Sequence, residues 1–281
     1  MTPYRVWVSE IMLQQTRVEA VKPYYDRFLK ELPTITDLAN AKEDRLMKLW
    51  EGLGYYNRVR NMQKAAIQMV EQYGGQFPES YEEIHALTGI GNYTAGAIGS
   101  FAFGIPKPAV DGNVLRVVSR ILASREDIMK AKVRTEIETA LEEVIPKDCP
   151  GDFNQGLIEL GAIVCVPNGE PKCEICPAAE ICRARKEGIA MELPVKTKAK
   201  ERKIEKRTVL VFHDSDTLAI QKRPDKGLLA GLYELPNLEG WLSQQEVIEY
   251  SKSIGLSPIR IKKTSGCEAY FQSCGMAHER V

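Results

Sequence analysis

Four cysteines in one short segment constrain the fold of this chain more than any other feature of its sequence. They follow the spacing Cys165-x7-Cys173-x2-Cys176-x5-Cys182, and no histidine lies between them. Four thiolates this close in sequence can all reach one centre, and all-cysteine sets of this kind suit either zinc or a [4Fe–4S] cluster. The spacing therefore predicts a metal-binding loop over residues 165–182 rather than a pair of disulfide bonds.

The sequence carries no signal for a membrane or for export. No apolar run approaches the roughly 20 residues that a membrane helix needs. The start of the chain carries Arg5 and Glu10 and lacks the layout of a signal peptide. We expect a cytoplasmic protein with reduced thiols and no membrane partner. Lysine plus arginine and aspartate plus glutamate each number 38, so the net charge neither indicates nor excludes a nucleic-acid partner.

Hydrophobic periodicity predicts a helical first domain and a small α/β second domain. Apolar residues recur at helical spacing in the first two-thirds of the chain, over residues 8–31, 41–51, 58–73, 81–87, 92–103, 113–123, 131–145 and 152–164. From Thr208, TVLVFH and TLAIQKR predict a β-hairpin, and QQEVIEYSKSIG predicts a helix. The predicted domains are residues 1–190 and 208–281, and Cys149 is interpreted as a small buried residue of the first.

A basic segment separates the two predicted domains. Seven lysines and arginines lie between Lys196 and Arg207, which predicts a linker over residues 191–207. Two interpretations stay open: a solvated tether, which is the usual role of a charge run, and a segment that follows DNA phosphates.

A glycine turn between two predicted helices is a candidate phosphate site. The segment SYEEIHALTGIGNYTAGAIGSFA places Gly89 and Gly91 between a helix that starts near residue 81 and one that ends near residue 103. Glycines let the backbone turn sharply, and the bare N–H groups at the start of the next helix can bind phosphate without reading base sequence. The alternative is an ordinary helical hairpin with a glycine turn.

Two acidic residues stand in settings that permit catalysis. Asp111 precedes a Gly-Asn pair that opens a helix, so it is either an N-cap or a catalytic acid. Glu10 lies among apolar residues in VSEIMLQQTRV. It is either a solvated helix residue or, when partly buried, a general acid with a raised pKa.

Taken together, these segments resemble the adenine DNA glycosylase family (MutY) of helix-hairpin-helix, iron–sulfur glycosylases. The similarity covers roughly residues 2–266 and is carried by the cysteine loop, VSEIMLQQTRV, WEGLGYYNRVRNM, LTGIGNYTAGAI, AVDGNVLRVVSR and GLLAGLYELPN. The resemblance implies a mainly α fold, a helix-hairpin-helix at residues 81–103 and a [4Fe–4S] cluster bound by Cys165, Cys173, Cys176 and Cys182. A partial α/β Nudix-like (MutT-like) domain would follow; it lacks the acidic box of the Nudix hydrolases, so we expect no pyrophosphatase activity.

The resemblance also implies catalytic roles for four side chains. Glu10 would protonate adenine at N7, Asp111 would stabilise the positive charge on the sugar, Asn113 would position Asp111, and Tyr93 would lie against the developing cation. Bifunctional relatives carry a lysine at the place of Tyr93, where it forms a Schiff base. We therefore expect a monofunctional enzyme that leaves an abasic site.

Four further residues are implied to contact DNA after the target base has flipped out. Gln15 would enter the gap left by the base, Tyr55 would wedge beside the opposing purine, and Gly89 and Gly91 would bind the backbone. Without the resemblance, Gln15 and Tyr55 would be interpreted as ordinary helix and surface residues. The implied partner is duplex DNA with A:8-oxoguanine or A:G mispairs, bound by a monomer associated with the nucleoid in a bacterial cytoplasm.

Other functions remain open from the sequence alone. One is an endonuclease III-like or mismatch thymine glycosylase, and another is a truncated DNA-binding protein without turnover. The family continues beyond both ends of this chain, so we expect a marginally stable fragment with weakened activity. The resemblance stops abruptly at Cys267. Our hypothesis is a frameshift, because Met276 followed by Ala277 encodes a tryptophan one base later, where the family has one.

Overall fold

The computed structural model describes residues 2–197, 203–214, 216–224, 226–263, 266–270 and 274–280. The chain forms two compact units, Met1–Thr197 and Lys198–Val281. None of the helices in these described ranges is long and apolar enough to span a lipid bilayer.

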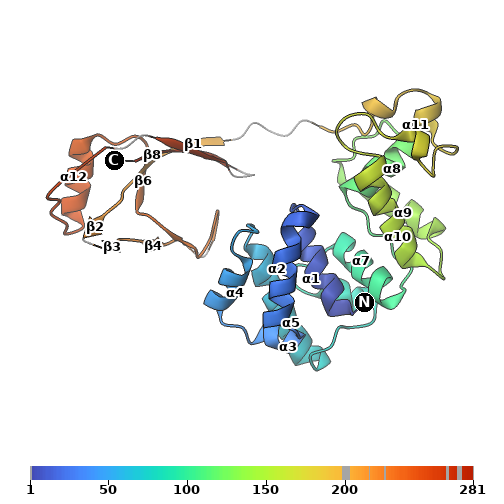
Figure 1. Ribbon diagram of the computed structural model, residues 1–281, viewed down its shortest axis with the longest axis horizontal. Helices are drawn as coiled ribbons and strands as arrows, with labels where there is room; N and C mark the ends of the chain where they lie inside the picture. The colour runs from blue at the N-terminus through green and yellow to red at the C-terminus, as the bar shows by residue number, and fades with distance from the viewer. Residues whose placement is uncertain are drawn as a thin grey trace. The chain divides into compact units, whose positions relative to one another are not determined.

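The first unit is helical throughout (Figure 1). Its α-helices are α1 (Pro3–Leu13), α2 (Val18–Glu31), α3 (Ile35–Ala39), α4 (Glu43–Trp50), α5 (Asn57–Tyr73), α6 (Tyr81–Ala86), α7 (Asn92–Phe103), α8 (Gly112–Leu122), α9 (Ala131–Val144), α10 (Pro150–Glu159) and α11 (Arg183–Lys186). A π-helical turn, η1 (Leu160–Val164), continues α10, and 3-10 turns form η2 (Cys173–Ile175) and η3 (Ala190–Glu192).

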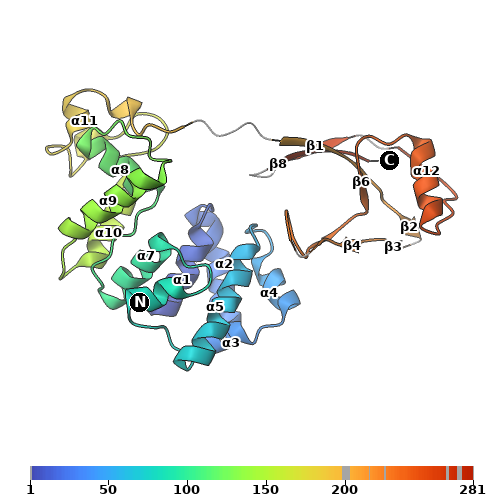
Figure 2. The ribbon, with the colours of Figure 1, turned by 180° about the vertical axis from the view of Figure 1, so that it is seen from behind.

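Two hydrophobic cores organise these helices. The first is built from helices α1 to α7 and contains the buried aromatic residues Trp7, Phe28 and Trp50. Phe28 meets Trp50 edge to face, with ring centroids 6.1 Å apart. The second core is built on α8, α9 and α10 around residues such as Leu115 and Leu141. Both ribbon views show α8 to α11 beside the group formed by α1 to α7, with α10 packed against α7 (Figures 1 and 2).

Asn154 on α10 ties the segment that connects the two cores. This buried side chain accepts a hydrogen bond from the Ala109 backbone N–H at 3.0 Å. It donates to the Ser100 hydroxyl and to the Lys107 carbonyl, each at 2.9 Å. Because every polar atom of its amide is paired, the residue fixes the path from α7 to α8 at little desolvation cost.

The helices differ from the sequence prediction at two places. Residues 8–31 were expected to form one helix, but the chain breaks between α1 and α2, where Gln15 adopts a φ of +59°. Residues 152–164 were expected to be one α-helix, but the last turn is the π-helix η1. Both departures depend on tertiary contacts described below.

Cys149 contradicts its prediction, because it is exposed rather than buried. It precedes Pro150 at the first turn of α10, and helix starts of this kind lie at the surface. The predicted linker also differs from the structure. Residues up to Thr197 belong to the first unit, where Leu193 is buried and Val195 forms a bridge to Asp127.

The second unit is a small α/β unit. Its elements are β1 (Lys203–Val209), β2 (His213–Asp214), β3 (Thr217–Leu218), β4 (Gln221–Lys222), β5 (Tyr233–Glu234), β6 (Asn237–Glu239), α12 (Gln244–Ser253), β7 (Cys267–Tyr270) and β8 (Cys274–Arg280). The sheet has the order β6-β1-β8-β7; β1 pairs with β6 antiparallel and with β8 parallel. Two-residue strands pair as β2-β3 and β4-β5.

The second unit departs from the sequence prediction in its strands. The first strand was expected at TVLVFH, whereas β1 starts at Lys203 and ends at Val209. The sequence predicted no element after Cys267, where the structure has β7 and β8. Residues 271–273 and 281 of that segment lie outside the described residues. The predicted helix is present as α12, which starts at a capping box made by Ser243 and Glu246.

Candidate functional site

Glu10 and Tyr93 meet where α1 packs against α7. The Tyr93 hydroxyl donates a hydrogen bond of 2.7 Å to Glu10 Oε2. Burial raises the pKa of Glu10, and the nearby charge of Asp111 raises it further, whereas the hydrogen bond from Tyr93 lowers it. Burial also raises the pKa of Tyr93, which therefore stays a hydrogen-bond donor. A raised pKa favours the protonated form of this carboxyl group relative to an exposed glutamate.

Asp111 starts α8 as its N-cap, which is one of the two roles that the sequence left open. Its Oδ1 accepts hydrogen bonds from the backbone N–H groups of Asn113 and Val114, each at 2.8 Å. Its Oδ2 accepts a hydrogen bond from Asn113 Nδ2 at 2.7 Å. It is therefore an N-cap that also faces Glu10 closely enough to affect its pKa. Three N–H groups at the start of α8 thus hold this carboxylate in place.

The site therefore takes one acid from each hydrophobic core. Glu10 and Tyr93 belong to helices of the first core, whereas Asp111 and Asn113 begin the helix that carries the second. The sequence-predicted catalytic residues are thus brought together. Their surroundings differ, because Glu10 accepts one hydrogen bond from Tyr93, whereas Asp111 accepts three from N–H groups at the start of α8.

Arg116 on α8 supports Asn113 from behind. Its NH2 group donates to Asn113 Oδ1 at 2.9 Å and to the Gly161 carbonyl at 2.7 Å. Its Nε donates to the Cys165 carbonyl at 2.7 Å. This buried guanidinium thus joins the start of α8, the π-helical turn η1 and the first cysteine.

Arg120 lies one turn further along the same face of α8. It donates to the Cys165 sulfur at 3.2 Å, to the Val166 carbonyl at 3.1 Å and to the Leu193 carbonyl at 2.9 Å. The side chain is buried. It therefore binds the start of the cysteine loop and the segment that follows the loop.

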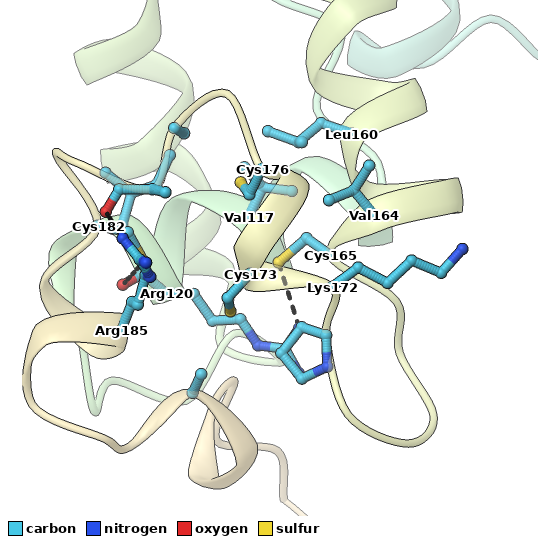
Figure 3. Close-up of a pocket in the computed structure, with 15 residues that line it drawn as sticks. Val117, Arg120, Leu160, Val164, Cys165, Lys172, Cys173, Cys176, Cys182 and Arg185 are labelled. Atoms are coloured by element: carbon cyan, nitrogen blue, oxygen red, sulfur yellow. Dashed lines mark hydrogen bonds between the residues drawn. The ribbon is translucent and has the colours of Figure 1, made fainter.

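The four predicted metal ligands line one cavity (Figure 3), together with Arg120. Burial raises the pKa of Cys173, and the negative charges of the other three cysteines raise it further. Over the part of the chain that the structure describes, no group of three or more cysteine, histidine, aspartate or glutamate side chains forms a site for a single metal ion. The cavity nevertheless brings the four thiols together, and an all-cysteine set of this kind suits either zinc or an iron–sulfur cluster.

Gln15 and Tyr55 both adopt a backbone conformation that side chains rarely take. Their φ angles are +59° and +48°, and neither residue is glycine. Both side chains are exposed, Tyr55 to 45%. A left-handed conformation raises the conformational energy of a residue with a side chain, and residues of this kind concentrate at functional sites. Two of the residues predicted to contact DNA have this conformation.

The hairpin turn lies beside these two residues. Gly89 has a φ of +79°, and a Cβ on it would lie 2.6 Å from the Cβ of Asn61. Gly91 is exposed and caps α7. One cavity connects the turn with Gln14, which precedes Gln15, and with Asn57, which follows the loop of Tyr55. It is lined by Trp7, Ile11, Gln14, Asn57, Arg58, Asn61, Met62, Thr88 and Gly89.

Comparison with known proteins identifies the family. Residues 8–147 match the family described as HhH-GPD superfamily base excision DNA repair protein. The adenine DNA glycosylase of Buchnera aphidicola (subsp. Baizongia pistaciae) is 36% identical over 250 residues, which cover 88% of this chain and 69% of that protein. The chain belongs to the adenine DNA glycosylase family. The family prediction from the sequence is therefore confirmed.

The relatives of this adenine DNA glycosylase family member differ from it in length. The Schizosaccharomyces pombe enzyme is 36% identical over 300 residues, which cover 89% of this chain and 64% of that protein. The chain spans about half to two thirds of the length of the first curated relatives that it matches.

Solved structures with the same fold carry several specificities. A thermostable thymine-DNA glycosylase and a non-covalent endonuclease III–DNA complex each match at a TM-score of 0.59 and 28% identity. The matches cover 66% and 67% of this chain and 85% and 86% of the respective neighbours. The fold alone therefore leaves the target base open.

Three arginines with structural roles were not predicted from the sequence. Arg116 and Arg120 lie four residues apart among the apolar positions of α8. This spacing places two charged residues on the buried face of the helix, and it could have predicted that both have buried partners. Arg58 lies inside the motif WEGLGYYNRVRNM, but nothing in its spacing indicates that it contacts backbone more than 40 residues away.

Proposed function

We propose that this chain is a monofunctional DNA glycosylase that hydrolyses the N-glycosidic bond of adenine opposite 8-oxoguanine or guanine in duplex DNA. The observation that carries the proposal is the buried Glu10 carboxyl, hydrogen-bonded by Tyr93 and facing Asp111. The names of the relatives and the DNA in the endonuclease III structure support the substrate class.

The chemistry follows from the two carboxyl environments. With adenine flipped out of the helix, protonated Glu10 donates its proton to the ring at N7 and turns the base into a leaving group. As the glycosidic bond breaks, its electrons leave with the base and the sugar becomes positively charged. Asp111, held by the N-terminus of α8, stabilises that charge until water adds to the sugar. Asn113 keeps Asp111 in place through its amide.

Tyr93 determines the outcome after base release. A phenol cannot form a Schiff base with the sugar, whereas a lysine at this position can. The hydroxyl is already engaged with Glu10. The product is therefore an abasic site in an uncut strand.

The cysteine loop is proposed to hold a [4Fe–4S] cluster through Cys165, Cys173, Cys176 and Cys182. When bound, the cluster would serve as a structural cross-link of the loop, because it connects four separated residues at one centre. The loop would then present nearby basic side chains to DNA phosphates. These are Lys172, Arg183, Arg185 and Lys186.

The metal can be tested without an activity assay. Purified protein is expected to contain iron and acid-labile sulfide, and Cys182→Ser is expected to lose both. Cys149→Ser is the matched control, because Cys149 is exposed and lies outside the cavity. Zinc in place of iron and sulfide would contradict the cluster.

The second unit is proposed to be a MutT-like domain that helps to recognise 8-oxoguanine. The basic segment before it would serve as its tether. Support comes from the motif GLLAGLYELPN, in which Leu229 takes a left-handed φ of +53°. We further propose that the protein acts as a monomer in a bacterial cytoplasm, with mispaired duplex DNA as its partner.

The function is tested by single-turnover base release. Duplexes with A:8-oxoguanine are incubated with excess protein, and alkali then reveals abasic sites. Glu10→Gln is expected to lower the rate by at least about a hundredfold, the usual size of a general-acid effect. The control is Glu19→Gln, at an exposed residue of α2.

Three outcomes would contradict the proposal. One is wild-type activity in Glu10→Gln. Another is release of thymine rather than adenine, and a third is tight binding without any base release. Borohydride is expected to trap no covalent complex, because no amine occupies the place of Tyr93.

A further inference from the structure

One arginine contacts the loops of both strained residues. Arg58 is at the start of α5, and its NH1 group donates to the carbonyls of Ile11 and Gln14, each at 2.7 Å. A third carbonyl of the same loop, that of Met12, accepts at 3.3 Å. These carbonyls belong to the C-terminal end of α1, where no helical partner remains for them. The cation therefore ends α1 directly before Gln15.

The other side of the same guanidinium holds the second loop. Arg58 NH2 donates to the carbonyls of Leu53 and Gly54 at 2.9 and 3.2 Å. The guanidinium also lies over the rings of Trp50 and Tyr55, at 5.2 and 5.6 Å from their centroids. Trp50 Nε1 donates to the Gly54 carbonyl at 3.0 Å. The backbone directly before Tyr55 is therefore held from two sides.

A single planar fork thus fixes the separation of two exposed residues from distant parts of the chain. Gln15 and Tyr55 each adopt a left-handed backbone conformation, which raises the conformational energy of a residue with a side chain. Such a conformation is kept only where the surrounding contacts enforce it. Arg58 supplies those surroundings at both places. A lysine carries the same charge but cannot donate from two rigidly spaced nitrogens.

We propose that Arg58 is a positioning residue that makes Gln15 and Tyr55 one rigid unit, so that both side chains enter mispaired DNA together. The inference rests on the proposed function, because that function supplies the DNA. Arg58 itself need not touch the DNA. Its contribution is that ordering one protruding residue also orders the other, so the entropy of both is lost on folding rather than on binding.

The test is a double-mutant cycle read by DNA binding. The probe is a duplex in which a stable abasic-site analogue lies opposite 8-oxoguanine. Arg58→Lys is expected to weaken binding roughly tenfold, and Tyr55→Ala is expected to cost far less in that background than in the wild type. Arg45→Lys is the matched control, since the exposed Arg45 pairs with Glu31 at the surface. Equal losses from Tyr55→Ala in both backgrounds would overturn the proposal.

A second cycle avoids any dependence on the folding of Arg58 variants. Gln15→Ala, Tyr55→Ala and the double variant are compared with Arg58 intact, and the double variant is expected to lose less DNA affinity than the product of the two single losses.

The Arg58→Lys variant also gives a readout that separates positioning from a merely structural role. A merely structural Arg58 would lower the melting temperature and the binding-competent fraction, but leave the Kd of that fraction unchanged. That result would also overturn the inference.

The two proposals fail in distinguishable ways. Wild-type protein that binds the probe but releases no adenine contradicts the proposed function, while the cycles stay readable. Wild-type protein that releases adenine and gives additive cycles contradicts the role of Arg58 alone.

Discussion

Gly161 allows the π-helical turn η1 to pack directly against the start of α8. A Cβ at this position would lie 2.5 Å from the Cβ of Asn113 and 3.0 Å from its Cα. Carbon atoms in contact prefer about 3.5–4.0 Å, so Gly161→Ala forces a displacement of about 1 Å. Neither partner is the far end of a flexible side chain, so the backbone itself must move.

The magnitude follows from two opposing effects. Overpacking of this kind costs about 1–3 kcal/mol, while alanine gains about 0.5–1 kcal/mol over glycine in helical backbone. We expect a net loss of about 1–2 kcal/mol in the free energy of unfolding. For a unit of this size, that lowers the melting temperature by about 2–8 °C. The displaced Asn113 also loses its 2.7 Å hydrogen bond to Asp111, so the single-turnover rate should fall more than tenfold.

The matched control is Gly156→Ala on α10. No atom lies within 4 Å of a Cβ built there, and the φ of this residue is outside the left-handed region. Calorimetry should therefore show a slightly raised melting temperature, with the rate of base release unchanged. If Gly161→Ala matched this control in both stability and rate, the argument that Gly161 sets the position of Asn113 would be refuted.

Three further predictions rest on individual hydrogen bonds. Tyr93→Phe removes the hydrogen bond that lowers the Glu10 pKa, so that pKa rises further and the protonated acid persists to higher pH. In the pH profile of the single-turnover rate, the alkaline limb should move to higher pH, and an unshifted limb would contradict this. Asn154→Ala removes three hydrogen bonds, among them that of the buried Ala109 N–H, and should cost about 1–3 kcal/mol in urea unfolding. A neutral effect would mean that water replaces the amide. Thr34→Ala opens the capping box with Asp37 at α3 and should cost about 1 kcal/mol in the same assay, with no change in base release.

The sequence was most informative where chemistry and local structure coincide. The cysteine spacing predicted a common centre, and all four cysteines line one cavity. Asp111 before Gly-Asn was interpreted as either an N-cap or a catalytic acid, and the structure shows the cap together with the proximity to Glu10. These patterns are local, because each involves residues that are close in sequence and of a type restricted by chemistry.

Long-range contacts explain what the sequence did not show. The break between α1 and α2 contains no glycine or proline. It exists because the Arg58 guanidinium donates hydrogen bonds to the carbonyl groups at the C-terminal end of α1. The π-helical turn likewise depends on the fit of Gly161 against Asn113. Cys149 was misplaced because thiols are usually buried, whereas the start of α10 places this one at the surface.

The division of the first unit into two hydrophobic cores has a consequence for how the chemistry can be controlled. The proton donor and the charge-stabilising carboxylate are each held rigidly by their own core, and the segment between α7 and α8 is the covalent connection between them. The distance from Glu10 to Asp111 is therefore set by how the two cores pack on each other, through α10 against α7 and the hydrogen bonds of Asn154, as well as by the contacts within each core.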